Sequence, residues 1–290
     1  MIKISNVSKS YGDKKALDSL SLEIKEGSVF GLLGVNGAGK TTILSILNGL
    51  ISMDEGEIEV FGLDMKRSQK EIKNISSIIP QHLAFYENLS VKENLDFFAK
   101  IQKATKEDYE KALEINSLTP LLNQLASTLS GGQKRRLNIA IGLLNNPKVI
   151  YFDEPTVGID PKSRNEILDS IKNYKNLGIT VVYTSHYMTE IEKICDEVAI
   201  ISDGRLIEQN TLENLLSNKV SDSISIEVIY KEVLKTLNVT LIDENTLQTT
   251  ADELFDTINL LNANAIPIKQ IRYGATNLEK YFLNVTGAEQ

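Results

Sequence analysis

Residues 34–41 constrain the fold of this chain more than any other stretch. They read GVNGAGKT, which matches the phosphate-loop pattern G-x-x-x-x-G-K-[ST] without a mismatch. A short apolar run at 28–33 precedes them, and residues 42–47 have the apolar spacing of a helix that would end near Gly49. Strand, glycine loop and helix is the context that confirms this motif, so the sequence predicts an α/β P-loop nucleotide-binding fold.

This loop supplies the groups that hold phosphates. Glycines allow backbone N–H groups to turn toward phosphate oxygens, and the following helix adds the positive end of its dipole. Lys40 is expected to reach the β- and γ-phosphates, Thr41 to hold Mg²⁺ and Thr42 to add a phosphate contact. The nucleotide-binding residues predicted in this segment are Gly34, Asn36, Gly37, Gly39, Lys40, Thr41 and Thr42.

A second apolar run, 148–152, ends in the carboxylates Asp153 and Glu154. Ligands of parallel sheets collect at the carboxyl ends of buried strands. Asp153 is therefore expected to bind Mg²⁺ through water, and Glu154 to orient or deprotonate the attacking water. An Asp-Glu pair alone would be read as a solvated turn. The phosphate loop earlier in the chain favours the catalytic interpretation.

Residues 129–133 read LSGGQ, and this pentapeptide resembles the signature of the ATP-binding cassette (ABC) family. Ser130 is a good N-cap for a helix over 133–141, so the signature is a second glycine-rich helix start. In the family, each ATP lies between the phosphate loop of one subunit and the signature of another. The resemblance implies that the signature residues contact an ATP held by the partner's Lys40. It also implies that Ser130 lies far from Lys40 of its own chain in a single copy. The implied signature contacts are Ser130, Gly131, Gly132 and Gln133.

Four more residues match the family pattern in order. The resemblance implies that Tyr11 stacks on adenine and that Gln81 senses Mg²⁺ and the γ-phosphate. It implies that Asp160 contacts the opposing subunit, and that His186 is the switch histidine that helps hold the attacking water. The resulting catalytic candidates are Glu154, His186 and Gln81, and the metal-binding candidates are Thr41, Gln81 and Asp153.

Lys134, Arg135 and Arg136 place three positive charges in the first turn of the signature helix. If exposed, each opposes the helix dipole at a cost of a few tenths of a kcal/mol. Two interpretations stay open: the charges raise the potential toward nucleotide or contact a partner subunit, or they are ordinary solvated charges.

Composition limits the classes of protein. The 290 residues are 42% hydrophobic, enough for one large domain and a small one. The lone Cys195 excludes an intrachain disulfide and suggests a cytosolic setting. No signal peptide is expected, and no apolar run reaches the roughly 18–20 residues that cross a bilayer. A net charge of −8 argues against binding nucleic acid or anionic lipid. Membrane attachment is therefore expected to be indirect and peripheral, at the cytoplasmic face.

Patterning predicts two domains. Residues 1–217 are expected to form an ABC-type cassette with a mixed sheet core and a helical subdomain at about 85–145, whose first helix opens with a capping box at Ser90 and Glu93. The first 80 residues read as strands with the phosphate-loop helix, and 148–208 return to a sheet pattern with a hairpin at 203–204. Phe85, Tyr86 and Leu89 form an apolar cluster that either lines a permease docking surface or belongs to the subdomain core.

Residues 218–290 are predicted to be a small α/β accessory domain. Expected in chain order are a strand at 223–229, a hairpin of 239–242 and 246–249 around the turn 243–245, a helix at 252–262, a strand at 266–273 and a helix at 277–284. The ending at 278–287 resembles export-type ATP-binding subunits. Gly158 departs from the Ser or Ala that the family often has before Leu-Asp, although glycine occurs there in export-type members.

The resemblance implies an ATPase subunit, using ATP and Mg²⁺, that powers translocation through a separate membrane permease. Export is favoured, and the cassettes pair as a homodimer or heterodimer. An importer ATPase remains an alternative. So does a soluble ABC ATPase acting on ribosomes or nucleic acid, although such proteins usually carry two cassettes or a long coiled coil. A kinase or GTPase is disfavoured by the LSGGQ signature and His186.

Overall fold

The computed structural model describes residues 1–217, 224–229, 239–241, 245–250, 252–273 and 278–286. Internal contacts divide the chain into a first unit, Met1–Leu212, and a second, Glu213–Gln290, and each is described here by itself. The boundary predicted at residue 217 is the last residue of helix α8 (Leu212–Ser217). No helix in the described part of the chain has both the length and the apolar character to cross a bilayer.

An antiparallel sheet begins the first unit. Its strand order is β2-β1-β4-β5, formed by β1 (Ile2–Tyr11), β2 (Lys14–Ile24), β4 (Glu55–Val60) and β5 (Leu63–Asp64). Gly12, at a φ of 58°, turns β1 into β2, so that Tyr11 pairs with Lys14. This tight hairpin brings residues from both strands to one place at the sheet end.

A six-stranded sheet forms the centre of the first unit, in the order β10-β9-β3-β8-β7-β6. The five strands from β9 to β6 are parallel to their neighbours, and the edge strand β10 runs antiparallel to β9. Their bounds are β3 (Val29–Leu33), β6 (Ser76–Ile79), β7 (Val149–Asp153), β8 (Thr180–Thr184), β9 (Glu197–Ser202) and β10 (Arg205–Thr211). Thr184 is in register with both Leu32 and Asp153, so the segments that follow β3, β7 and β8 leave the same sheet edge.

Helix α1 (Lys40–Leu47) joins the two sheets into one core. Its buried residues Ile43 and Leu44 share a hydrophobic cluster with Ile4 of β1 and Tyr151 of β7. The N-terminus of α1 is thereby held at the carboxyl end of β3. A second helix, α2 (Gln69–Ile75), precedes β6. The prediction of strands with a single helix over the first 80 residues was wrong here, because this short helix buries only Ile72 and has little apolar periodicity.

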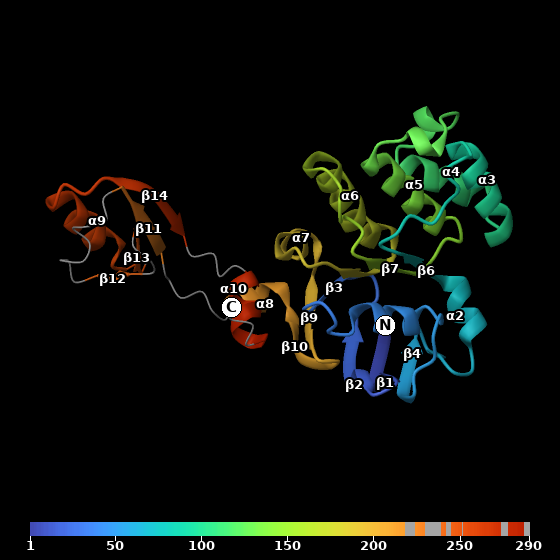
Figure 1. Cartoon of the computed structure of the whole chain (residues 1–290), viewed down its shortest axis with the longest axis horizontal. Helices are drawn as coiled ribbons and strands as arrows, with labels where there is room; N and C mark the ends of the chain where they lie inside the picture. Colours follow the sequence, from blue (N-terminus) through green and yellow to red (C-terminus); the bar gives the residue numbers. More distant parts are fainter. Residues whose placement is uncertain (218–223, 230–238, 242–244, 251, 274–277, 287–290) are drawn as a thin grey trace. The chain divides into compact units, whose positions relative to one another are not determined.

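Three helices make up the helical subdomain, all within the predicted span of 85–145, and Figure 1 shows them gathered beside β6. They are α3 (Val91–Gln102), α4 (Lys106–Ile115) and α5 (Gly131–Leu143). Short 3₁₀ turns at Thr119–Leu121 and Ala126–Thr128 connect α4 to α5. Each of the three helices begins with a capping box, which fixes the residue at which the helix starts.

Residues 148–208 were expected to follow a sheet pattern, but the segment also contains two helices and a 3₁₀ turn. They are α6 (Pro161–Asn173), α7 (Met188–Ile194) and the turn at Tyr174–Leu177. The sequence-based prediction missed both helices. The signal was present for α6, since Asp160 caps it, Pro161 opens it and Ile167, Leu168 and Ile171 are buried at helical spacing.

The second unit is an antiparallel sheet in the order β12-β13-β11-β14. Its elements are β11 (Ile224–Val228), β12 (Thr240–Leu241), β13 (Thr246–Thr249), α9 (Leu254–Ala263), β14 (Ile268–Tyr273) and α10 (Leu278–Thr286). Ile226 and Leu247 pack with Leu261 of α9 in a separate core. Of the predicted elements, residues 223, 242–244 and 277 lie outside the described residues.

Candidate nucleotide-binding site

The phosphate loop lies between β3 and α1 as predicted, and its glycines are required by geometry. Gly37 and Gly39 have φ of 85° and 106°, in the left-handed region that favours glycine. A Cβ atom on Gly39 would lie 2.6 Å from the carbonyl oxygen of Ala16, and one on Gly34 would lie 2.7 Å from that of Ile201. The loop backbone is therefore packed closely against β2 and β9 while its other side faces the cavity.

Lys40 is buried at the first position of α1, with 6% of its surface exposed. Its Nζ donates to the carbonyl oxygens of Gly34, at 2.7 Å, and Val35, at 3.3 Å. Burial lowers the pKa of this ammonium below its usual value, while Glu154 and Asp153 oppose that shift by attraction. The side chain is held inside the curl of the loop, where phosphate oxygens can replace the carbonyl acceptors.

Asp153 ends β7 directly opposite the start of α1. Its Oδ1 accepts a hydrogen bond from Thr41 Oγ1 at 3.3 Å and lies 3.1 Å from Thr184 Oγ1. This pair of one hydroxyl and one carboxylate fits Mg²⁺, which prefers oxygen ligands and keeps several waters or substrate phosphates. The described residues contain no cluster of three or more His, Cys, Asp or Glu side chains that could hold a metal alone.

Glu154 points away from Asp153 because its backbone has a φ of 48°. Its N–H donates to Thr184 Oγ1 at 3.0 Å, which fixes this left-handed turn. The side chain meets the next loop, where Nδ1 of His186 lies 3.2 Å from Glu154 Oε2. Of the three catalytic candidates, Glu154, His186 and Gln81, the first two are therefore in direct contact.

A buried glutamate that sequence reasoning did not single out holds the His186 loop. Glu190, 2% exposed, accepts hydrogen bonds from the hydroxyls of Thr156 at 2.8 Å, Tyr183 at 2.8 Å and Ser185 at 2.7 Å. These donors come from the segment after Glu154 and from the end of β8. The network ties together the two segments that carry Glu154 and His186.

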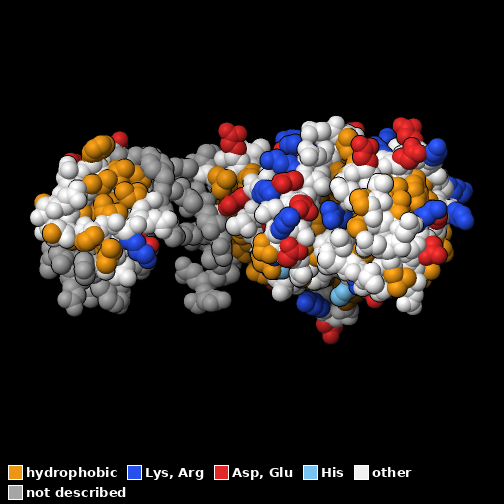
Figure 2. Space-filling model, turned by 90° about the horizontal axis from the view of Figure 1, so that it is seen from above, with side chains coloured by type: hydrophobic (Ala, Val, Ile, Leu, Met, Phe, Trp, Pro, Cys, Tyr) orange, Lys and Arg blue, Asp and Glu red, His pale blue; other side chains and the backbone are white. Residues whose placement is uncertain are grey.

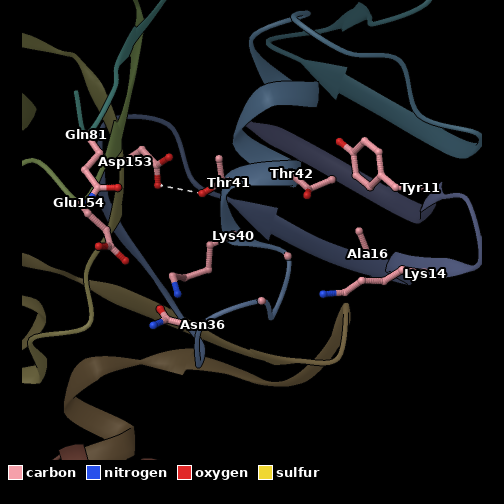
Figure 3. A pocket seen from close by; sticks show the side chains of 12 residues that line it. Tyr11, Lys14, Ala16, Asn36, Lys40, Thr41, Thr42, Gln81, Asp153 and Glu154 are labelled. Carbon is pink, nitrogen blue, oxygen red and sulfur yellow. Dashed lines mark hydrogen bonds between the residues drawn. The ribbon is translucent and has the colours of Figure 1, made fainter. Parts of the chain in front are cut away.

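A cavity of about 480 Å³ lies between the loop, β7 and the β1–β2 hairpin (Figure 3). Ten predicted site residues line it: Tyr11, Asn36, Gly37, Gly39, Lys40, Thr41, Thr42, Gln81, Asp153 and Glu154. Lys14 and Ala16 also line it and were not predicted. Figure 3 shows Lys14 directed toward the phosphate loop. A lone lysine in a strand has no motif to reveal it, and only its pairing with Tyr11 brings it here.

The signature and Asp160 lie outside this cavity and close to each other. A Cβ on Gly132 would be 2.4 Å from Ser163 of α6, and one on Gly131 would be 3.7 Å from Ile159. Asp160 caps α6 by accepting from the Ser163 N–H at 3.0 Å, which lowers the pKa of its carboxyl. Ser130, Gly131, Gly132, Gln133 and Asp160 are therefore brought together on a second surface, apart from Lys40.

The three basic residues of the signature helix have three different environments. Lys134 Nζ contacts Glu87 Oε1 at 2.8 Å, and Arg136 lies 3.6 Å from Glu166. Arg135 is 3% exposed and its guanidinium donates to the carbonyl oxygens of Pro80 and Gln81. Neither interpretation offered from the sequence describes Arg135, because its guanidinium is buried against the main chain of its own subunit.

Comparison with known proteins agrees with this geometry. Residues 17–157 match the family model described as ABC transporter. The linearmycin resistance ATP-binding protein LnrL of Bacillus subtilis (strain 168) is 37% identical over 99% of this chain and 98% of its own length. The chain belongs to the ABC transporter family. The daunorubicin resistance ATP-binding protein DrrA3 of Streptomyces coeruleorubidus is 31% identical over 100% of this chain and 96% of its own length.

Among solved structures, a dimeric post-hydrolysis state of the ATP-binding cassette MJ0796, bound to ADP and Pi, is similar to 73% of this chain and 99% of its own. The TM-score is 0.65 at 27% identity. The sequence-based predictions of an ABC-type α/β fold and of an export-type ATP-binding subunit are confirmed. The protein is an ABC ATPase, a transporter subunit of the kind that works with a membrane permease and forms dimers.

Proposed function

We propose that the cavity binds ATP with Mg²⁺ and that each chain supplies half of two composite active sites. The observation that supports this is the separation of two sets of residues. Lys40, Thr41 and Asp153 line one cavity, whereas Ser130 and Gly132 lie on another surface. Tyr11, half exposed at the cavity rim, would stack on adenine, and Lys14 would add a positive charge between the base and the phosphate loop.

Within each site, Thr41 and Asp153 would hold Mg²⁺, which neutralises phosphate charge when bound. Thr42 and Asn36 would contact phosphates, and Gln81 would contact the metal and the γ-phosphate from the cavity wall. Glu154 would orient and deprotonate the attacking water, and His186 would hold Glu154 and the γ-phosphate in place. Phosphoryl transfer depends on such positioning more than on covalent chemistry.

Two copies of this chain would then close head to tail around two ATP molecules. Each signature helix would present Ser130, Gly131, Gly132 and Gln133 to the γ-phosphate of the partner's site, and Asp160 would contact the partner beside them. We favour a homodimer because this chain carries every expected residue of both half-sites. A heterodimer would be shown by a second cassette that co-purifies in equal amount.

Substitution of Glu154 by Gln tests the composite site. Glutamine keeps the shape of the side chain but does not accept a proton, so ATP should bind without turnover and the closed dimer should accumulate. Sizing at saturating ATP is expected to show a dimer for Glu154→Gln and mostly monomer for the exposed control Glu107→Gln. A Glu154→Gln protein that binds ATP but stays monomeric would refute the composite site.

We further propose that ATP turnover powers export through a separate permease at the cytoplasmic face of the membrane. Two relatives that match over nearly the whole chain are resistance ATP-binding proteins, and a third is named as a Nod factor export protein, which favours export, with an antibiotic-like cargo, over import. On the face drawn in Figure 2, acidic and basic side chains are mixed, without a basic patch suited to nucleic acid. Cells that depend on this protein for resistance should become sensitive with Lys40→Ala, and unchanged resistance would oppose an export role.

An exposed aromatic cluster on the helical subdomain suits permease docking. Tyr86, which is 51% exposed, has its ring centroid 5.1 Å from that of Phe97 and 6.2 Å from that of Phe98. The cluster lies on α3 and on the segment that follows Gln81, so movement at the nucleotide can reach it. Tyr86→Asp should abolish co-purification of the permease while ATP binding persists. The control is Leu50→Asp, at a residue that is also exposed, at 61%, but lies after α1. Equal co-purification by both variants would refute docking here.

Residues 1–217 and 218–290 are proposed as separate domains with separate tasks. Every residue assigned to the ATP site lies before residue 187, and the second unit has its own core. A chain truncated after residue 219 should bind ATP like the full chain, and its dimerisation or assembly with the permease should be altered. Wild-type transport by the truncated chain would show that the accessory domain is dispensable.

A further inference from the structure

Arg135 is a buried cation that contacts the Gln81 segment. It lies in the first turns of α5, and Gln81 precedes it by 54 residues in the chain. Its Nη1 donates to the Pro80 carbonyl oxygen at 2.8 Å, and its Nη2 donates to the Gln81 carbonyl oxygen at 2.6 Å. The guanidinium therefore binds the main-chain carbonyl groups on both sides of the Cα atom of Gln81, whose side chain lines the ATP cavity.

This arrangement is costly for a residue that merely fills space. Burial lowers the pKa of the Arg135 guanidinium, and none of the ion pairs seen among the described residues includes it. Its Nε also has no hydrogen-bond partner in the described part of the chain. An apolar side chain of similar length would fill the same volume without desolvating a charge. What it could not do is fix two successive carbonyl groups, which the planar fork of arginine does.

Two further contacts attach the same segment to α5. Asn138, also buried, accepts a hydrogen bond at its Oδ1 from the Ala84 N–H at 2.9 Å. Lys134 Nζ contacts Glu87 at 2.8 Å. Residues 80–87 are thus bound along one side of the first two turns of α5. A displacement of the Gln81 main chain has to move α5 or break these hydrogen bonds.

Close packing makes α5 a rigid element between two parts of the fold. A Cβ on Gly142, near its C-terminus, would lie 2.2 Å from Ile79 of β6, the strand that leads to Gln81. A Cβ on Gly132, at its N-terminus, would lie 2.4 Å from Ser163. Helix and neighbours approach so closely at both ends that small shifts are transmitted rather than absorbed.

We propose that Arg135 is a positioning residue that couples the two ATP sites of the dimer. It links Gln81, which contacts the nucleotide held by its own chain, to Ser130–Gly132, which contact the nucleotide held by the partner. This inference rests on the composite site proposed above. Binding of ATP in one site then places the signature for the other, so that closure around the two nucleotides is cooperative.

The test compares Arg135→Met with Arg136→Met in a Glu154→Gln background. Both substitutions remove one positive charge from the same helical turn. Arg136 differs from Arg135 because it is partly exposed and makes a long ion pair with Glu166, at 3.6 Å. The protein concentration at half-dimerisation is measured by sizing at saturating ATP, and ATP affinity is measured at concentrations where the chain is monomeric. Arg135→Lys is the conservative variant, since it keeps the charge and can bond one carbonyl.

Arg135→Met is expected to raise the half-dimerisation concentration about tenfold, within the usual range of coupling between sites. The ATP affinity of the monomer should stay within about twofold of the Glu154→Gln parent. A simple loss of stability would not weaken dimerisation while leaving ATP affinity unchanged. Arg135→Lys should lie between wild type and Arg135→Met, and Arg136→Met should change neither quantity by more than about twofold.

Unchanged dimerisation of Arg135→Met, or an equal loss in Arg136→Met, would overturn the coupling role. If Arg135→Met does not bind ATP at all, that variant is treated as misfolded and Arg135→Lys becomes the test. Wild-type dimerisation of Arg135→Lys, with normal ATP affinity, would then overturn the coupling role. Failure of Glu154→Gln alone to dimerise would instead refute the composite site on which this inference rests.

Discussion

The helices α1 and α5 both start in glycine-rich segments and both carry a predicted phosphate-binding N-terminus, yet their N-termini are capped differently. Helix α1 starts after Gly39, in a left-handed conformation, and no side chain caps it. Helix α5 starts after Ser130, whose Oγ accepts from the Gln133 N–H while Gln133 Oε1 accepts from the Ser130 N–H. The first terminus faces the cavity without a side-chain cap, and the second is capped by its own residues.

This difference in capping fits the proposal that each chain contributes one helix N-terminus to its own ATP and the other to the ATP of its partner. The α1 terminus has buried Lys40 beside it and is arranged to hold phosphate in its own chain. The α5 terminus is stable without an anion because of its capping box, so a lone copy can keep its signature exposed. The Ser130 hydroxyl only accepts a hydrogen bond in this box, so under the proposed arrangement its O–H can donate to a partner's ATP while the cap stays formed.

The strongest test of the α1 side is Lys40→Ala. Loss of two or more charge-assisted hydrogen bonds, about 1.5–3 kcal/mol each, should weaken ATP binding at least about 100-fold and eliminate ATPase activity. Titration with a fluorescent ATP analogue measures the loss. Lys106→Ala, at an exposed lysine of α4, should bind normally. Wild-type affinity in Lys40→Ala would mean that the α1 terminus does not hold the phosphates.

Gly132→Ala tests how tightly the α5 terminus is packed. The added methyl would meet Ser163 at 2.4 Å, so unfolding should require about 1–3 kcal/mol less free energy, as for other overpacked sites. Gly131→Ala has room, with its nearest neighbour at 3.7 Å, and should cost less than about 1 kcal/mol. Chemical denaturation of the nucleotide-free chains measures both. Equal stability of the two variants would show that the signature does not pack rigidly on α6.

Ser130→Ala is expected to change stability less than Gly132→Ala does, and it separates capping from ATP contact. Loss of an N-cap costs about 1 kcal/mol, and Ser90→Ala removes the cap of α3 from the same kind of box. Both variants should therefore lose similar stability. Only Ser130→Ala should also lower the ATPase rate, by about tenfold, because it loses a hydrogen bond to a phosphate. If Ser90→Ala slowed turnover as much, the α5 terminus would have no special role.

Sequence patterns predicted the local parts of the site well. The phosphate loop, the end of β7 and the signature helix start are where the motifs placed them, since each depends on neighbouring residues and on glycines or capping side chains at defined spacing. Eight of the twelve cavity residues follow from the phosphate loop and the end of β7, and Tyr11 and Gln81 were expected only from the family resemblance. The helices α6 and α7 were missed, although Asp160 and Pro161 at the start of α6 carry a recognisable signal.

From its sequence alone the chain could be assigned to the ABC family, with ATP as substrate and with Lys40, Asp153 and Glu154 as candidates, because these residues act through local backbone geometry. Tertiary structure alone decided the rest. Lys14 reaches the cavity through strand pairing, Glu190 gathers three hydroxyls from two segments, and Arg135 is buried against carbonyls more than fifty positions away. The physical reason is that the environment of a charged side chain depends on which distant elements pack around it, and a charge in a helix looks the same in sequence whether it meets water or a carbonyl group.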